Sequence, residues 1–243
     1  DTIASINLLR LSSKHLAEYR DTRLEEVKPA TFNKDLNFIS VVISTAIFEW
    51  GIYLPSNPCK LIKRLKEPAP RNRILEGDEY DRLIKATALM KNIYFVPAIM
   101  FSIETAIRKG ELLLARYENI NFRERTLYIP DTKTASLDRH QTSERTIPLS
   151  DLALSIITQL PRQLSGRIFA TTDDALSNCW KKAIKKAKIK DLRWHDLRRH
   201  AVSKMFEKGL SVPEVQVCSG HKNPMILLNT YTKLNPSKIA KKL

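Results

Sequence analysis

The sequence is poor in cysteine, with three among 243 residues. Cys59, Cys179 and Cys218 lie far apart, and none belongs to a Cys-x-x-Cys pair. A disulfide framework or a zinc site requires more cysteines at closer spacing, so neither is indicated. We interpret all three as ordinary thiols. Because thiols stay reduced in the cytoplasm, we expect a cytoplasmic protein.

Other signals are also missing. No apolar run approaches the roughly 20 residues that span a bilayer, so we expect no membrane-spanning segment. Neither a P-loop pattern nor a carboxylate cluster for a metal occurs, and we therefore expect a protein that uses no cofactor and no metal. The chain begins without Met and without a secretion signal. We expect it to be a fragment that lacks its natural N-terminus.

Positive charge, by contrast, is abundant. Lys and Arg number 41 against 26 Asp and Glu, which gives a net charge of +15. This excess predicts a polyanionic partner, with DNA or RNA the first candidate and an acidic membrane surface the second. Of these two we expect a nucleic acid and no membrane partner. Five lysines between residues 181 and 188 form either a solvated helix face or a site for backbone phosphates, and the sequence leaves both open.

Residues 1–66 have a helical pattern. Ser12 is a candidate cap for one helix and Thr31 for a longer one, and residues 60–66 predict a short basic helix. Apolar side chains recur at three- and four-residue steps in the longer helix, which predicts one buried stripe. The stripe consists of Phe32, Leu36, Ile39, Ile43, Ile47 and Trp50.

A proline-rich, charged stretch at residues 67–73 predicts a linker to a second domain, residues 74–243. This domain has helical patterns at 76–90, 92–105, 150–160 and 173–188. Two strand-like runs, 125–130 and 145–149, flank a long polar segment and predict a hairpin. The predicted fold is therefore mainly α, with a small β-sheet or hairpin in the second of two domains.

The last fifty residues gather groups that handle protons and anions. His195 and Arg198 are three residues apart and share a helix face. His221 and Tyr231 follow. Two proton carriers, a fixed cation and a nucleophile without a carboxylate cluster indicate phosphoryl transfer to a protein hydroxyl, on a nucleic acid.

Four segments, in order, resemble the tyrosine recombinase (phage integrase) family, and the resemblance covers nearly the whole chain. They are residues 104–112 around Arg108, 132–134 with Lys133 ahead of 145–149, 195–198, and Gly220-His221 leading to Tyr231. Each alone is a weak motif, but the four in order are specific. The resemblance implies a helical core-DNA-binding domain at 1–66 and a catalytic domain at 74–243, which together form a clamp on double-stranded DNA.

The chemistry of the candidate residues fits this resemblance. A phenol has a pKa near 10, so Tyr231 is a more accessible oxyanion nucleophile than a serine. Arg108 and Arg198 offer planar, permanently charged donors to a phosphate. The alternatives are a core or surface tyrosine and arginines in surface ion pairs.

Proton transfer is assigned to three further residues. Lys133 is the candidate acid for the leaving 5′ oxygen, and a solvated loop lysine is the alternative. His195 and His221 are candidates to accept the phenol proton or to bind the phosphate, against a structural role. Glu111 follows Arg108 and is expected to orient the site rather than react.

The resemblance implies site-specific recombination through a 3′-phosphotyrosyl intermediate, with four protomers acting on two recombination sites. It also implies a prokaryotic mobile element or phage and accessory DNA-bending or directionality proteins. Two alternatives are a type IB topoisomerase and a catalytically silent DNA-binding regulator on the same fold.

The chain departs from the family at two places. His221 and Tyr231 are one residue further apart than is usual, and the hairpin after Lys133 is longer. We expect the extra residue in the turn before the tyrosine helix, with Pro224 at the first helical position.

Overall fold

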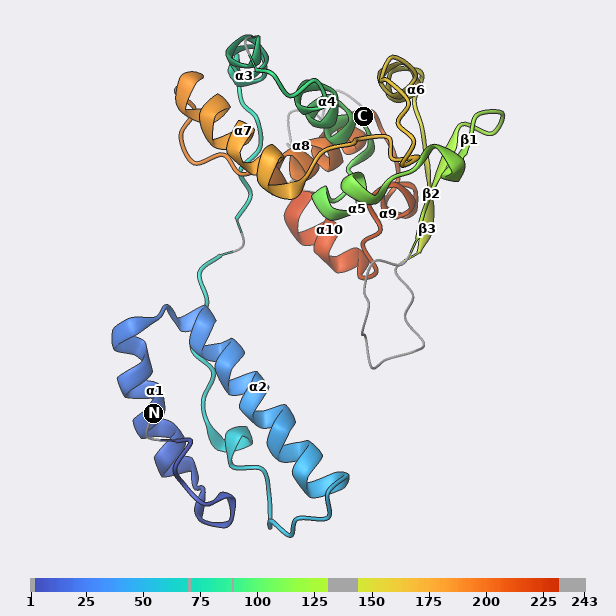
Figure 1. The fold of residues 1–243 in the computed structure, drawn as a ribbon. Helices are drawn as coiled ribbons and strands as arrows, with labels where there is room; N and C mark the ends of the chain where they lie inside the picture. The colour runs from blue at the N-terminus through green and yellow to red at the C-terminus, as the bar shows by residue number, and fades with distance from the viewer. Residues whose placement is uncertain (1–2, 70, 89, 131–143, 232–243) are drawn as a thin grey trace, which may run out of the picture. The chain divides into compact units, whose positions relative to one another are not determined.

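The computed structural model describes residues 3–69, 71–88, 90–130 and 144–231. The chain forms two compact units, Asp1–Pro70 and Arg71–Leu243. The boundary falls inside the stretch 67–73, since Arg71 already bonds within the second unit, to Asp191 and Asp196. The described residues are mainly helical with one small antiparallel sheet, which confirms the predicted fold class (Figure 1). Within these ranges no helix is long and apolar enough to cross a bilayer.

The first unit is built on two helices, α1 (Ser13–Glu26) and α2 (Pro29–Phe48), with short 3-10 turns η1 (Leu8–Arg10) and η2 (Pro58–Leu61). Ser12 caps α1 as predicted, in a reciprocal arrangement with His15, whose Nδ1 lies 3.2 Å from the Ser12 amide. The second helix begins at Pro29, two residues before the predicted cap Thr31. Proline suits this first position because its missing N–H would have no partner there.

Most of the predicted apolar stripe of α2 is packed against α1. The core of the unit consists of Leu16, Phe32, Leu36, Ile43, Cys59 and Ile62. Ile39 and Ile47 are partly buried against it. Trp50, however, lies beyond the end of α2 and is 63% exposed. The prediction that it belongs to the buried stripe is therefore wrong.

The predicted basic helix at residues 60–66 is also wrong. Only η2 is helical; Ile62 ends it in an extended conformation, and residues 63–69 form no helix. The buried Asn33 of α2 explains this, because its side chain donates to the Leu65 carbonyl (2.9 Å) and accepts from the Leu65 amide (3.1 Å). The Leu65 amide thereby bonds to Asn33 instead of to the carbonyl four residues earlier, as a helix would require.

The second unit is mainly helical. Its helices are α3 (Glu79–Thr87), α4 (Phe95–Thr105), α5 (Lys109–Leu114), α6 (Asp151–Thr158), α7 (Asp173–Lys186), α8 (Trp194–Glu207), α9 (Val212–Ser219) and α10 (Pro224–Tyr231). Ser150 and Thr172 cap α6 and α7 through their hydroxyls. Pro224 is the first residue of α10, as predicted.

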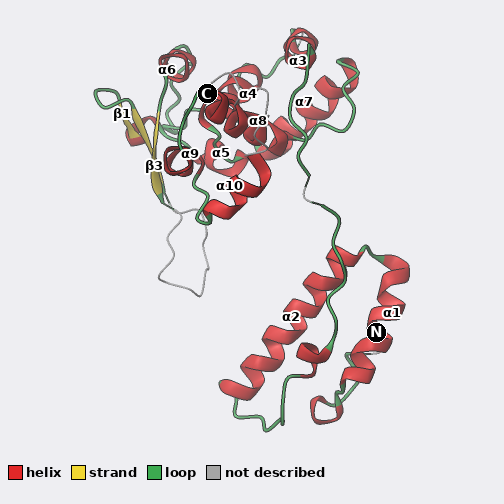
Figure 2. Ribbon diagram, turned by 180° about the vertical axis from the view of Figure 1, so that it is seen from behind, coloured by secondary structure: helices red, strands yellow, loops and turns green. Residues whose placement is uncertain are grey.

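A three-stranded sheet lies at one edge of this unit, beside α6 and α9 (Figure 2). The strands β1 (Ile120–Asn121), β2 (Thr126–Ile129) and β3 (Arg145–Pro148) follow the 3-10 turn η3 (Tyr117–Asn119) and pair antiparallel in the order β1-β2-β3. Leu127 pairs with Ile147, and both are fully buried. The predicted hairpin is therefore confirmed for its two strands, with β1 added.

Helix α4 forms the centre of the second unit. It packs on both α6 and α8, and Phe95, Ile99 and Phe101 are fully buried. A separate small core joins the end of α4 to α8, α9 and α10; it includes Ala106, Val202, Val215 and Leu227. His195 and Arg198 lie on α8, Tyr231 is the last residue of α10, and Arg108 and His221 lie in the turns after α4 and α9.

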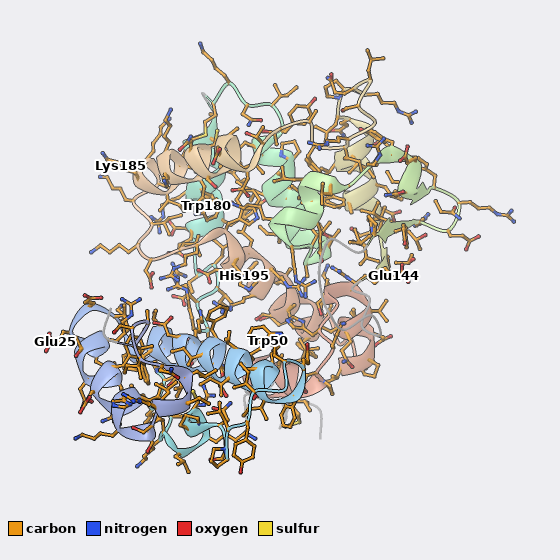
Figure 3. The ribbon with its side chains drawn as sticks, turned by 60° about the horizontal axis from the view of Figure 1, so that its bottom comes forward. Glu25, Trp50, Glu144, Trp180, Lys185 and His195 are labelled. Carbon is orange, nitrogen blue, oxygen red and sulfur yellow. The ribbon has the colours of Figure 1, made fainter. Side chains whose placement is uncertain are left out.

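The lysines of α7 lie on the exposed face of that helix, where both a solvated face and a site for backbone phosphates stay possible. Lys181, Lys182, Lys185 and Lys186 are exposed, whereas Leu176, Trp180 and Ala183 are buried on the opposite side. Lys185 extends outward while Trp180 points into the unit (Figure 3).

Candidate active site

Arg108 lies in the turn that joins α4 to α5. Ala106 ends α4 in a left-handed conformation (φ 55°). The Arg108 amide donates to Glu111 Oε2 (2.9 Å) at the start of α5. Its guanidinium donates to Glu111 Oε1 (2.7 Å) and to the Gly220 carbonyl (3.2 Å), and the side chain is 42% exposed. The Arg108 side chain is therefore oriented by the protein yet accessible to a ligand.

Glu111 connects two arginines. It is buried, and Arg145 of β3 donates to both of its carboxylate oxygens at 2.8 Å. Burial alone would raise the pKa of Glu111, but the hydrogen bonds from Arg145 and from the Arg108 backbone lower it to about 2. The carboxylate is thus ionised at neutral pH and holds both cations.

Arg198 lies one turn into α8 and is buried. It donates to the Ala106 carbonyl (2.5 Å) and to the Ser219 carbonyl. Arg108 binds the carbonyl of the next residue, Gly220. The two predicted phosphate ligands therefore meet at one short turn, residues 219–220, although 90 positions separate them in the sequence (198 minus 108).

His221 follows this turn. Its Nδ1 lies 2.7 Å from Ser219 Oγ, and that hydroxyl donates its single proton to the Val215 carbonyl (2.6 Å). Because the proton is used, Nδ1 must be the donor, which leaves Nε2 as the acceptor in the neutral ring. Burial, together with the nearby cations Arg198 and Arg108, lowers the pKa of His221 to about 4. A neutral ring with an acceptor nitrogen suits proton acceptance.

His195 is in the first turn of α8 and remains exposed. The pKa of His195 is lowered, first because neighbouring protein atoms partly desolvate the ring and then because the cations Arg199 and Arg198 lie nearby. Its environment is therefore cationic, like that of His221.

A hollow of about 360 Å³ brings three of the predicted residues together, Arg108, His195 and Arg198. Its remaining lining comes from the end of α4 and the starts of α5 and α8, namely Ser102, Ile107, Lys109, Arg193 and Trp194. Four cationic side chains around one hollow make it suited to an anion such as a phosphodiester.

The remaining two predicted residues are not placed in the site. Lys133 lies outside the described residues. The backbone of Tyr231 forms the last residue of α10, which packs on α8 and α9. Its side chain is not described.

Sequence reasoning missed two charged residues that form buried ion pairs beside the candidate residues, Arg145 and Asp196. Asp196 is fully buried and accepts from Arg71 (2.8 Å), Arg199 (2.9 Å) and the Arg193 amide (2.8 Å). Its place in the first turn of α8 could have signalled the bond to the Arg193 amide. No local signal indicates Arg71 or the pairing of Arg145 with Glu111.

Comparison with known proteins decides the family. The model of the phage integrase family matches residues 73–238, more than half of the chain. The chain belongs to the phage integrase family. This match spans the hollow, Glu111 and α10, and it confirms the resemblance drawn from the four motifs.

A similar protein supports this family assignment. The shufflon-specific DNA recombinase of Escherichia coli is 33% identical over 99% of this chain. The chain covers 62% of that recombinase's length.

Solved structures show the same fold. The Tn1549 transposon integrase in complex with a circular intermediate DNA matches all of this chain and 87% of its own, with 15% identity and a TM-score of 0.77. A lambda integrase tetramer bound to a Holliday junction matches 95% of this chain and 68% of its own, with 20% identity and a TM-score of 0.67.

Proposed function

We propose that this chain is the DNA-cutting part of a tyrosine-type site-specific recombinase or integrase. One observation carries the proposal: Arg108 and Arg198 both bind the turn at residues 219–220, which leads through His221 directly to α10 and Tyr231. A phosphate bound by the arginines would lie close to a proton acceptor and to the helix that bears the nucleophile.

In the proposed reaction the Tyr231 oxygen attacks the scissile phosphorus, and the bond from phosphorus to the 5′ oxygen breaks. Arg108 and Arg198 neutralise the charge that grows on the non-bridging oxygens. The products are a 3′-phosphotyrosyl ester and a free 5′ hydroxyl. The 5′ hydroxyl of a partner strand then attacks the ester and restores Tyr231.

Two protons move in the cleavage step. Nε2 of neutral His221 accepts the phenol proton, and Lys133 gives a proton to the leaving 5′ oxygen. His195 donates a hydrogen bond to the phosphate. The energy of the broken phosphodiester stays in the tyrosyl ester, so the chemistry consumes no ATP.

The substrate and assembly follow from the family. We infer that the substrate is double-stranded DNA carrying recombination sites, that the unit up to residue 66 binds the core site, and that the two units form a clamp. The lambda integrase neighbour is a tetramer on a Holliday junction, which supports a tetramer here. A cytoplasmic location and accessory DNA-bending or directionality proteins complete the proposal.

Covalent trapping tests the proposal. Target duplexes are first selected from a random pool by binding to the chain, and a nick is then placed beside the cleaved bond so that religation fails. We expect a protein–DNA adduct whose modified peptide contains Tyr231. Tyr231→Phe should form no adduct, whereas Tyr53→Phe, at an exposed tyrosine of the first unit, should react as wild type.

The same assay distinguishes the alternatives. An adduct in Tyr231→Phe would contradict the mechanism. Binding without any adduct would favour a silent regulator. Relaxation of supercoils by monomers, without exchange between paired sites, would favour a type IB topoisomerase.

A further inference from the structure

Arg145 is an enclosed cation between the sheet and the candidate site. It is the first residue of β3, where it pairs with Ile129 of β2. Its side chain is 11% exposed, which is unusual for an arginine unless its charge is paired. Both terminal nitrogens of Arg145 bind Glu111, at 2.8 Å each.

The other side of Arg145 contacts the turn that precedes His221. A Cβ built on Gly220 would come within 2.7 to 2.8 Å of Arg145 Nε, Cδ and Cζ. The guanidinium therefore packs directly against the Gly220 backbone. Strand β3, Glu111 and this turn are joined through one side chain.

We propose that Arg145 is a positioning residue for the cleavage reaction, which holds Glu111 and the Gly220–His221 turn so that Arg108 stays available to the phosphate. The proposal rests on the proposed function, because it concerns the same site. Nothing in the reaction requires Arg145 to contact DNA.

The effect on Arg108 follows from charge sharing. Each Glu111 oxygen accepts one bond from Arg145 and one from Arg108. Without Arg145, Arg108 would be the one cation among the described residues that still bonds to this buried carboxylate. An unpaired buried charge is costly, so Glu111 would draw Arg108 more strongly and compete with the phosphate.

The effect on His221 is electrostatic and geometric. Burial, Arg198, Arg108, His195 and Arg145 all lower the pKa of His221, in that order of size. Removing the Arg145 cation should raise that pKa. It also removes the group against which the Gly220 backbone packs, so the ring loses a support.

Three variants separate these effects. Arg145→Gln removes the charge and the paired hydrogen bonds. Arg145→Lys keeps the charge but lacks the two terminal guanidinium nitrogens that bind both Glu111 oxygens. Arg125→Gln is the matched control, because Arg125 belongs to the same sheet region and pairs with Asp151 (2.6 Å), but both side chains are exposed. Cleavage of the nicked duplex is measured in single turnover against pH, alongside DNA affinity and thermal unfolding.

Arg145→Gln should slow cleavage at saturating DNA by about 10- to 100-fold, as expected for a misplaced catalytic group. DNA affinity should change less than about 3-fold, since most phosphate contacts persist. The acid limb of the pH profile should move to higher pH. Arg145→Lys should have the acid limb of wild type but still cleave slowly. Arg125→Gln should match wild type in both the cleavage rate and its pH profile.

An NMR titration of the His221 ring on the DNA-free chain gives a second readout, with the signal assigned from its loss in His221→Asn. The proposal is overturned if Arg145→Gln leaves the His221 midpoint unmoved and slows cleavage only in proportion to lost folded protein. Absence of a Tyr231 adduct in wild type would reject the proposed function instead, and the titration would still decide the role of Arg145.

Discussion

The Gly220 backbone packs against the Arg145 side chain and leaves no space for a Cβ atom, because an added Cβ would lie 2.7 Å from Arg145 Nε. Gly220 also ends α9 in the left-handed region, at φ 67°. Two independent requirements therefore select glycine at this position. Its carbonyl accepts from Arg108, so both requirements bear on a proposed phosphate ligand.

Gly220→Ala should be more damaging than an ordinary left-handed glycine replacement. The backbone strain costs about 1 kcal/mol, and displacement of Arg145 adds a further cost of about 1–3 kcal/mol. Gly77→Ala is the matched control, because Gly77 has φ 51° but open space around it. Urea unfolding measures both, and equal losses of stability would refute the close packing.

Glu111 should make the second unit sensitive to acid. Its pKa is lowered from 4.5 to about 2, so the folded state binds fewer protons than the unfolded state between these values. Its contribution, about 3 kcal/mol, is complete above pH 4.5 and is lost as pH falls toward 2. The unfolding free energy of Glu111→Gln should therefore depend less on pH across this window. Glu25→Gln, at an exposed site in the first unit, should leave the slope unchanged.

Asp196→Asn should destabilise the second unit by about 3 kcal/mol. The carboxylate is fully buried between Arg71 and Arg199, and removing its charge leaves two cations with a weaker partner. Asp151→Asn breaks an exposed pair with Arg125 and should cost less than about 1 kcal/mol. Guanidinium unfolding compares the two, and similar costs would contradict the buried network.

His221 should be neutral at pH 7 and should titrate near pH 4 in the DNA-free chain. The folded pKa lies below the unfolded value, so its contribution to stability is lost as pH falls through the range from 6.5 to about 4. Nitrogen chemical shifts should show the proton on Nδ1, as the bond to Ser219 requires. A midpoint near 6.5, or a proton on Nε2 in the neutral ring, would contradict the site geometry.

Much of the fold could be predicted because the relevant signals are local. Ser12 before α1 and the alternation in β2 and β3 each depend on neighbours in the sequence. Prediction failed where a distant partner decided the conformation. The non-helical chain at Leu65 is explained by its bonds to Asn33, and no pattern within residues 60–66 reveals that contact.

The sequence by itself determined the family and the mainly helical fold, because motif order and periodicity are properties of the chain alone. It also indicated six candidate residues, whose roles stay predictions. Only the tertiary structure decided that Arg108 and Arg198 meet at residues 219–220, that Arg145 binds Glu111 and that Asp196 binds Arg71. These contacts join residues far apart in sequence. Burial made them necessary, since each enclosed charge had to find a partner from another element.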